Sequence, residues 1–255
     1  MNTKILLKKL AKRFPKRLAK IYHDHVGLMC GCLPNEVNKI LLCLDFDEIV
    51  LPYVKEYKPD IIITHHPFIY GSKAKILKND PIKKKLVDEL EVLNIPVYSF
   101  HTNFDAGSGG MNDALAAALK LENIYAPQKE IMMRIGTLAN VMEIHEFAKY
   151  AKNCLDIEYG QLVNAGSKTI KKIGIIGGGG SRDFPTAILE NCDIYISGDA
   201  PHYVRRDIIA RHFNYLDFPH EIEKIFMPTM KELLLSYDQS LDIKIIDHEN
   251  RPEII

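Results

Sequence analysis

The chain has 255 residues, of which 47% are hydrophobic, so it is long enough for one large α/β domain or two smaller ones. Lysine plus arginine and aspartate plus glutamate number 33 each, and this balance gives no bulk field that would favour nucleic acid or a membrane. No apolar run approaches the roughly 20 residues of a membrane span, and the apolar core of a secretory signal is missing, so we expect a cytoplasmic protein.

The N-terminal segment departs from the overall charge balance. Residues 1–20 carry eight lysines and arginines and no acidic residue. Its apolar residues at helical spacing are Ile5, Leu6, Leu10 and Phe14. Such a segment suits a membrane-surface helix or a transit peptide, or else a first helix whose apolar stripe packs on the domain. Pro15 divides the pattern into short pieces, which favours the packed helix.

The cysteines are scattered along the chain, at Cys30, Cys32, Cys43, Cys154 and Cys192. Cys30 and Cys32 form a lone C-x-C with no second pair, which argues against a structural zinc site. We expect all five to be reduced and mostly buried thiols, as fits a cytosolic compartment.

Apolar segments of strand and helix type alternate along the chain. We expect strands at 39–44, 60–64 and 95–100, helices at 47–57, 80–94 and 111–120, and then strand, helix and strand within 131–165. The alternation begins again with "KKIGIIG" at 171–177. Alternation of this kind indicates a mostly parallel sheet covered by helices on both faces, the α/β class.

The second alternation resembles the first. "KILLCLDFDEIVLPYVKEYKPDIIITHH" begins at Lys39, and "KIGIIGGGGSRDFPTAILENCDIYISGD" begins at Lys172, at a constant offset of 133. The matching pairs are Ile40 with Ile173, Asp60 with Asp193, Ile61 with Ile194 and Thr64 with Ser197. We therefore expect a single domain made of two pseudo-equivalent α/β lobes, about 1–130 and 131–255.

Four polar clusters follow the expected strands: "THHP" at 64–67, "HTNFD" at 101–105, "SGDAPH" at 197–202 and "PHEIE" at 219–223. Ligands of parallel α/β sheets gather at the carboxyl ends of the strands, so we expect the clusters to be pooled in one cleft. Adjacent residues on a regular strand point to opposite faces, so His65 and His66 both reach a cleft only where the strand is ending.

The clusters combine imidazoles with carboxylates, the mixed donor set that divalent transition metals prefer. The donors are His65, His66, Asp105, His220 and Glu223, with His101 as a sixth candidate. One catalytic metal normally takes three protein ligands, whereas this number suits two metals about 3.5–4 Å apart. Two divalent ions against two carboxylates leave an excess of about two positive charges, which would attract an anionic substrate.

Glycine-rich stretches precede two of the helices. "IGIIGGGGSRDFP" at 173–185 is either a phosphate cradle or a tight turn that brings helix and strand close. It matches neither G-x-x-x-x-G-K-[ST] nor G-x-G-x-x-G, which favours the turn. "DAGSGGMNDALA" at 105–116 makes a sharp turn into its helix, with Asn112 or Asp113 capping the helix or supporting the site.

These motifs together resemble the GTP cyclohydrolase 1 type 2 homologues, also called NIF-three-like proteins, over almost the whole chain. "ITHHPFIY" resembles I-T-H-H-P-L-x-x, and "SFHTNFDAGSGGMNDALA" resembles H-T-N-L-D-x-x-x-G-G-x-N-D-x-L-A. "YISGDAPHY" resembles T-G-D-x-x-x-H, "PHEIEKIF" resembles G-H-x-x-E-K, and the opening "FPKRLAKIYHDHVGLMCG" resembles the family's first helix and W-D-N-x-G-L-x-x-G.

The resemblance implies a two-lobed α/β fold, a toroidal homohexamer and a dinuclear divalent metal site. By the motifs, the implied ligands are His65, His66, Asp105, His220 and Glu223. Imidazole plus carboxylate suits Zn, Fe, Mn, Ni or Co, and no other cofactor is indicated.

The chain departs from the family pattern in three places. W-D-N reads H-D-H here, which adds His23 and His25 either near the site or on the surface. Pro219 replaces the usual glycine before the late histidine, so the carboxylate ligand is Glu223 or Glu221. The inserted domain of larger members is absent.

The sequence thus predicts a metal-dependent hydrolase that uses two divalent ions on a small anionic substrate, by nucleotide ring opening or phosphoester hydrolysis. His101 is the first candidate for orientation or proton transfer, followed by Asp199 and His202. The alternative is a non-enzymatic metal-binding scaffold or regulatory adaptor, because fold does not decide function.

Overall fold

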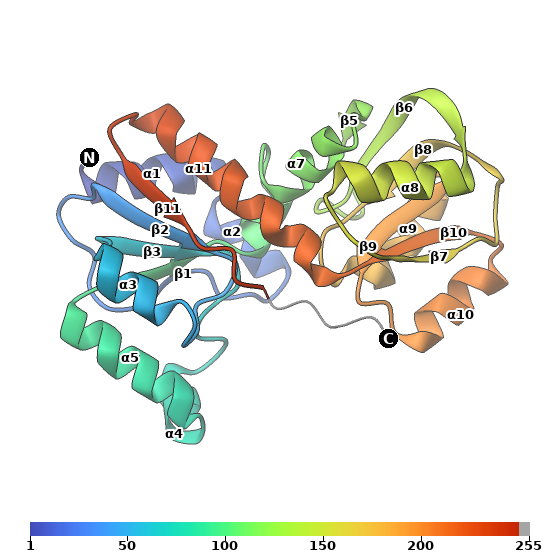
Figure 1. Cartoon of the computed structure of the whole chain (residues 1–255). Coiled ribbons are helices and arrows are strands. Elements are labelled where there is room, and N and C mark those ends of the chain that lie inside the picture. The colour runs from blue at the N-terminus through green and yellow to red at the C-terminus, as the bar shows by residue number, and fades with distance from the viewer. Residues whose placement is uncertain (250–255) are drawn as a thin grey trace. The chain divides into compact units, whose positions relative to one another are not determined.

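The structure is a computed structural model that describes residues 1–249 (Figure 1). The chain forms two compact units. Unit 1 comprises residues 1–108 together with the segment from Phe226 onward, and unit 2 comprises residues 109–225. Each unit has its own sheet and its own helices.

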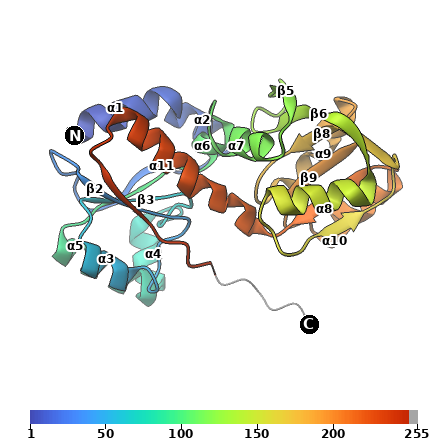
Figure 2. The same cartoon turned by 45° about the horizontal axis from the view of Figure 1, so that its top comes forward.

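The sheet of unit 1 has the strand order β1-β4-β3-β2-β11. Its strands are β1 (Gly27–Cys30), β2 (Lys39–Cys43), β3 (Ile61–Thr64), β4 (Val97–Ser99) and β11 (Asp242–Ile245). Its helices are α1 (Thr3–Arg13), α2 (Lys16–Ile21), α3 (Leu51–Tyr57), α4 (Lys73–Asn79), α5 (Pro81–Leu93), α6 (Thr102–Ala106) and α11 (Phe226–Tyr237). Neighbouring strands are parallel except at the β1–β4 edge. Figures 1 and 2 show α1 and α11 on one face of this sheet and α3 and α5 on the other.

The central strands of unit 1 are buried on both faces, which explains their unbroken apolar sequence. All four residues of β3 are buried, as are four of the five residues of β2. On one face, Leu41 and Ile62 join the core cluster that contains Val54 of α3 and Leu86 of α5. Burying side chains on both faces leaves only the strand ends for polar residues, and the polar clusters of unit 1 begin there.

Helix α1 confirms the packed interpretation of the N-terminal segment. Leu6 and Leu10 are buried on it, and Phe14 is buried directly after it. Ile5 differs from the expected stripe, because 53% of it is exposed.

The sheet of unit 2 has the order β5-β6-β8-β9-β10-β7. Its strands are β5 (Glu122–Tyr125), β6 (Arg134–Glu143), β7 (Gln161–Val163), β8 (Thr169–Ile175), β9 (Ile194–Gly198) and β10 (Asn214–Phe218). Its helices are α7 (Met111–Ala118), α8 (Ile144–Cys154), α9 (Phe184–Leu189) and α10 (His202–Ala210), with the 3₁₀ turns η1 (Gly180–Asp183) and η2 (His220–Ile225). Only β8, β9 and β10 run parallel, so this sheet is mixed, whereas the alternation of strands and helices predicts a mostly parallel one.

The internal repeat recurs in the strand pairing of the two units. In β2–β3, Ile40 pairs with Ile61, and in β8–β9, Ile173 pairs with Ile194, so both partners are shifted by the same offset of 133. The aspartates before the second strands also correspond. Asp60 Oδ2 accepts hydrogen bonds from the backbone N–H groups of residues 38 and 39, and Asp193 Oδ2 accepts from those of residues 171 and 172.

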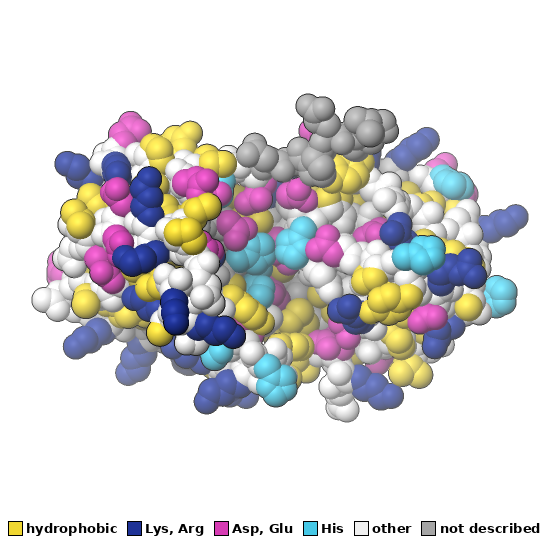
Figure 3. Space-filling view, turned by 90° about the horizontal axis from the view of Figure 1, so that it is seen from below, with side chains coloured by type: hydrophobic (Ala, Val, Ile, Leu, Met, Phe, Trp, Pro, Cys, Tyr) yellow, Lys and Arg dark blue, Asp and Glu magenta, His cyan; other side chains and the backbone are white. Residues whose placement is uncertain are grey.

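The expected α/β class is confirmed, with two sheets flanked by helices. All five cysteines are free, and Cys30, Cys43 and Cys192 are buried. Among the described residues, no helix combines the length and apolarity needed to cross a bilayer. Charged side chains of both signs are interspersed over the face shown in Figure 3, in keeping with the balanced composition.

We expect Asp60→Ala and Asp193→Ala each to lower the free energy of unfolding by about 1–2 kcal/mol, because each leaves two backbone N–H groups without their carboxylate acceptor. Urea unfolding followed by circular dichroism measures the change. Asp207→Ala, at an exposed position of α10, is the control and should change stability little. Equal stability of all three variants would show that the repeated aspartates do not support the strand pairs.

Candidate metal site

Two adjacent histidines emerge together from the end of β3. The backbone N–H groups of His65 and His66 both donate to the carbonyl oxygen of Leu44, each over 3.1 Å. Thr64 Oγ1 donates to the carbonyl oxygen of His66 over 2.8 Å. These bonds end the regular strand, so the side chains no longer alternate between faces, and the two ring centroids lie 5.0 Å apart.

The polar cluster after β4 brings a third imidazole and a carboxylate to the same place. The His101 ring centroid lies 5.1 Å from that of His65 and 5.5 Å from that of His66. One ring nitrogen from each of the three histidines lies within 4.8 Å of the others. Asp105, on α6 and 4% exposed, places Oδ1 3.6 Å from Nε2 of His65, which is fully buried. We name His65, His66, His101 and Asp105 the unit 1 cluster.

Each imidazole of the unit 1 cluster has its Nδ1 atom beside an oxygen acceptor. The partners are Phe100 O for His65 at 2.9 Å, Asp45 Oδ2 for His66 at 2.7 Å and Asp24 Oδ2 for His101 at 2.7 Å. A proton on Nδ1 that is donated to such an acceptor leaves the lone pair on Nε2. Metal-binding histidines are oriented in this way by carboxylates and carbonyls.

Neither orienting carboxylate is among the residues predicted from the sequence. Asp45 follows β2 at its carboxyl end, which is the signal that would have found it. Asp24 lies in the H-D-H segment, 77 residues before His101, and only the fold brings the two together.

Asp24 is a buried carboxylate held by several donors. Its Oδ2 accepts from Thr102 Oγ1 over 2.7 Å as well as lying beside His101, and its Oδ1 accepts from the His25 N–H over 2.7 Å. Burial acts to raise the pKa of the Asp24 carboxyl, but the interactions with His101, Thr102 and His25 outweigh it and lower the pKa to about 2. In the folded protein at neutral pH, the Asp24 carboxyl group is therefore ionised.

Unit 2 presents a second group of donors on η2. His220 Nε2 lies 3.0 Å from Glu223 Oε2, and Glu223 is 4% exposed. His220 Nδ1 lies 2.5 Å from Oδ2 of Asp199, so Asp199 orients the His220 ring. Asp199 itself has a left-handed backbone, with φ of +56°. Glu223, rather than Glu221, is the buried carboxylate beside the histidine. His202 instead begins α10 with its side chain exposed.

The glycine run makes room for Glu223. Gly178 has φ of +61°, and a Cβ at this position would lie 1.9 Å from Glu223 Oε1. The Gly177 N–H donates to Asn112 Oδ1 over 2.8 Å, so Asn112 holds the run from α7. The glycines thus form a tight turn, as predicted from the sequence, and this turn lets the Glu223 carboxylate lie close to the backbone of Gly178. Asp113 supports the turn into α7, because its Oδ2 accepts from the Gly109 N–H over 2.6 Å, and it also pairs with the buried Arg134 at 2.6 Å.

The residues present fit a divalent transition metal. The unit 1 cluster supplies imidazoles and a carboxylate, and His220 with Glu223 supplies one of each. These are the neutral nitrogen and anionic oxygen ligands that such ions take.

We predict that Gly178→Ala weakens metal binding, because the added Cβ displaces the Glu223 carboxylate and the backbone there favours glycine. Titration with Co²⁺ or Zn²⁺ should give a loss of about tenfold or more in affinity at the affected site. Gly179→Ala is the matched control, since a Cβ there meets no atom within 4 Å. Equal affinities in the two variants would contradict the assigned role of Gly178.

We also predict a pH-dependent effect of Asp24→Asn. Because the pKa of Asp24 is lowered from 3.8 to about 2, its charge stabilises the wild-type fold fully above pH 4, and the contribution is lost as the pH falls towards 2. Unfolding in urea at pH 7 and at pH 3 should therefore show a larger difference between wild type and variant at pH 7. A difference that is constant with pH would argue against the ionised hydrogen-bonded carboxylate.

Known proteins are similar to this chain in sequence and in fold. The family model for Duf34/NIF3 (NGG1p interacting factor 3) matches residues 1–252. A Lactococcus lactis protein named GTP cyclohydrolase 1 type 2 homolog is 30% identical over 243 residues, which cover 93% of each chain. A Bacillus cereus protein related to NIF3 superposes with a TM-score of 0.87 at 20% identity, covering 100% of this chain and 99% of that one. A Staphylococcus aureus protein gives 0.86 at 24% identity, covering 96% of each. The resemblance seen in the motifs is confirmed, and the chain belongs to the Duf34/NIF3 family.

Proposed function

We propose that this protein binds two divalent metal ions per chain and is a metal-dependent hydrolase. The observation that carries the proposal is the orientation of the three imidazoles of the unit 1 cluster. Each has Nδ1 beside an oxygen, and one ring nitrogen from each converges within 4.8 Å of the others. A structural histidine cluster does not require its rings to be oriented alike, whereas a site in which His65 and His66 bind metal and His101 transfers a proton beside them does.

The proposed ligands are those named from the motifs. In unit 1 they are His65, His66 and Asp105, and in unit 2 they are His220 and Glu223. When bound, two divalent ions supply Lewis acidity and lower the pKa of water towards neutrality. Metal identity stays within Zn, Fe, Mn, Ni or Co for this donor set.

The remaining polar residues of the site take positioning and proton-transfer roles in this proposal. His101 takes or gives a proton at Nε2 while Asp24 holds its Nδ1. Asp199 holds Nδ1 of His220 in the same way. His202 is the third residue predicted for these roles, and its exposed position makes it the least supported of the three.

The proposed substrate is a small anion, such as a nucleotide or another phosphate ester. The curated relatives carry the name GTP cyclohydrolase 1 type 2 homolog, which supports hydrolytic ring opening of a nucleotide. Hydrolysis of a phosphoester suits the same donors equally well. By family resemblance we also propose a homo-oligomer, a toroidal hexamer, and a cytoplasmic location that suits five free cysteines.

Metal analysis of the purified protein tests the binding step. We expect about two ions per chain in the wild type and fewer in His65→Ala and in Glu223→Gln. His202→Ala, an exposed change in unit 2, is the control and should keep the wild-type content. Metal content that is unchanged in both ligand variants would refute the ligand assignment.

A turnover screen with nucleotides and phosphoesters then tests the hydrolase. His101→Ala should retain its metal and lose about 10²–10⁴-fold in turnover, because it removes a proton-transfer group rather than a ligand. Metal binding without turnover of any compound would favour the metal-binding scaffold or regulatory adaptor instead.

A further inference from the structure

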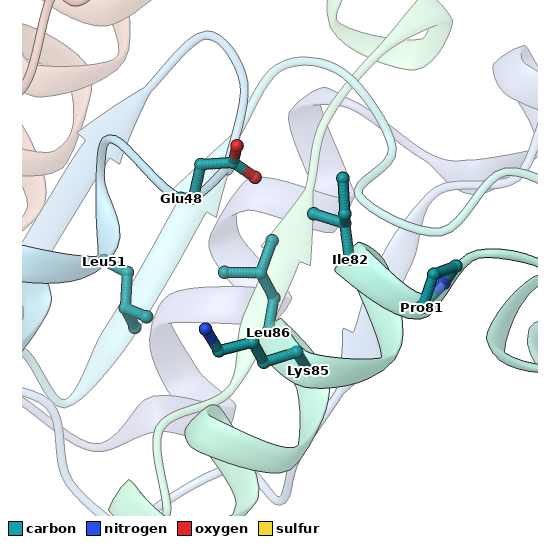
Figure 4. A pocket seen from close by; sticks show the side chains of 6 residues that line it. All are labelled: Glu48, Leu51, Pro81, Ile82, Lys85 and Leu86. Atoms are coloured by element: carbon teal, nitrogen blue, oxygen red, sulfur yellow. The ribbon is translucent and has the colours of Figure 1, made fainter.

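Unit 1 has a polar recess formed by α2 and the H-D-H segment after it. Its volume is about 390 Å³. The lining residues are Lys16, Lys20, His23, Asp24, His25 and Val26. It contrasts with the pocket of about 370 Å³ on α3 and α5, whose lining in Figure 4 is mainly aliphatic. Basic and imidazole side chains make up most of the lining of the recess, and these are groups that receive anions.

The two lysines are placed by their helix and by a glycine. Lys16 and Lys20 are four residues apart on α2 and therefore share one face of it. Gly27 has φ of +110°, and a Cβ there would lie 2.4 Å from Lys16 Nζ and 2.8 Å from its Cε. The absence of a side chain at Gly27 is what lets the Lys16 ammonium group lie against the backbone of β1.

The two histidines are placed by the way α2 ends. His23 adopts the left-handed conformation, with φ of +55°, which is uncommon for a residue with a side chain. The Asp24 N–H donates to the carbonyl oxygen of Ala19 over 3.0 Å, and the His25 N–H donates to Asp24 Oδ1. The turn is therefore held on both sides, and both imidazoles are exposed to solvent at the recess.

The charge of the lining is positive. Among the described residues that line the recess, the only acidic one is Asp24, and its carboxylate is engaged by His101, Thr102 and the His25 N–H. The lining thus holds two ammonium groups and one carboxylate, and that carboxylate already has hydrogen-bond donors. Ammonium and imidazole groups suit an anion with several acceptor oxygens, which is the chemistry of a phosphate group.

We propose that this recess is a binding site for a phosphate group, either free phosphate or the phosphate of a larger molecule. The lining residues all come from one short stretch of the chain, residues 16–26. The site needs no metal and none of the proposed metal ligands, and it stands or falls separately from the hydrolase.

The experiment is isothermal titration calorimetry of metal-free protein at low ionic strength, with inorganic phosphate, adenosine 5′-monophosphate and adenosine as probes. We expect phosphate to bind the wild type and to bind the double variant Lys16→Ala/Lys20→Ala about tenfold or more weakly. Arg17→Ala removes one positive charge from the same helix outside the lining and should stay within about twofold of wild type. Adenosine should not bind.

NMR spectra of the histidine ring protons locate the site in the same samples. The variants His23→Gln and His25→Gln identify which signal belongs to which of the two histidines. Phosphate should shift the signals of His23 and His25, and the His65→Ala variant should bind phosphate as the wild type does. Tighter binding of the monophosphate than of phosphate identifies a larger ligand, and equal binding identifies phosphate itself. The proposal is overturned if the double lysine variant binds like wild type, if binding is lost in His65→Ala, or if phosphate does not saturate the protein.

Discussion

The site in unit 1 depends on a single carbonyl group. The Leu44 oxygen, just past the end of β2, accepts from the N–H groups of two successive residues, His65 and His66. A regular strand would send these two side chains to opposite faces, one of them into the core. Because both amides bond to one acceptor, the chain leaves the sheet at this point, and the two imidazoles come within 5.0 Å of each other.

The orienting oxygens extend this arrangement to the other histidines. Asp24, Asp45 and Asp199 each lie beside the Nδ1 of an imidazole, and a backbone carbonyl does so for His65. Converging donors and buried carboxylates such as Asp105 and Glu223 are costly to desolvate, and a bound cation would offset that cost. This is the physical reason to connect the polar clusters with metal rather than with packing.

The internal repeat accounts for the strand-pair register and the aspartate–backbone hydrogen bonds that occur in both units. The pairing of β2 with β3 and that of β8 with β9 share one register, and an aspartate caps the N–H groups of the first strand in each. The segments beyond the paired strands differ between the units. In unit 1 the strand ends in two histidines, and in unit 2 the corresponding chemistry comes from Asp199 and from η2. The same pair of parallel strands is thus followed by different polar side chains in the two units, as expected if a fold does not fix the chemistry at its strand ends.

The sequence by itself determined the α/β class, the buried strands and the main candidate ligands, because these depend on local periodicity and on residue types at strand ends. The tertiary structure decided what depends on distant contacts. Asp24 contacts His101, which lies 77 residues further along the chain. Glu223 packs against Gly178, whose left-handed backbone conformation cannot be read from the sequence. The tertiary structure also buried Glu223 beside His220 while leaving Glu221 partly exposed, and it gave unit 2 a mixed sheet, since burial and strand pairing arise only when separate segments pack together.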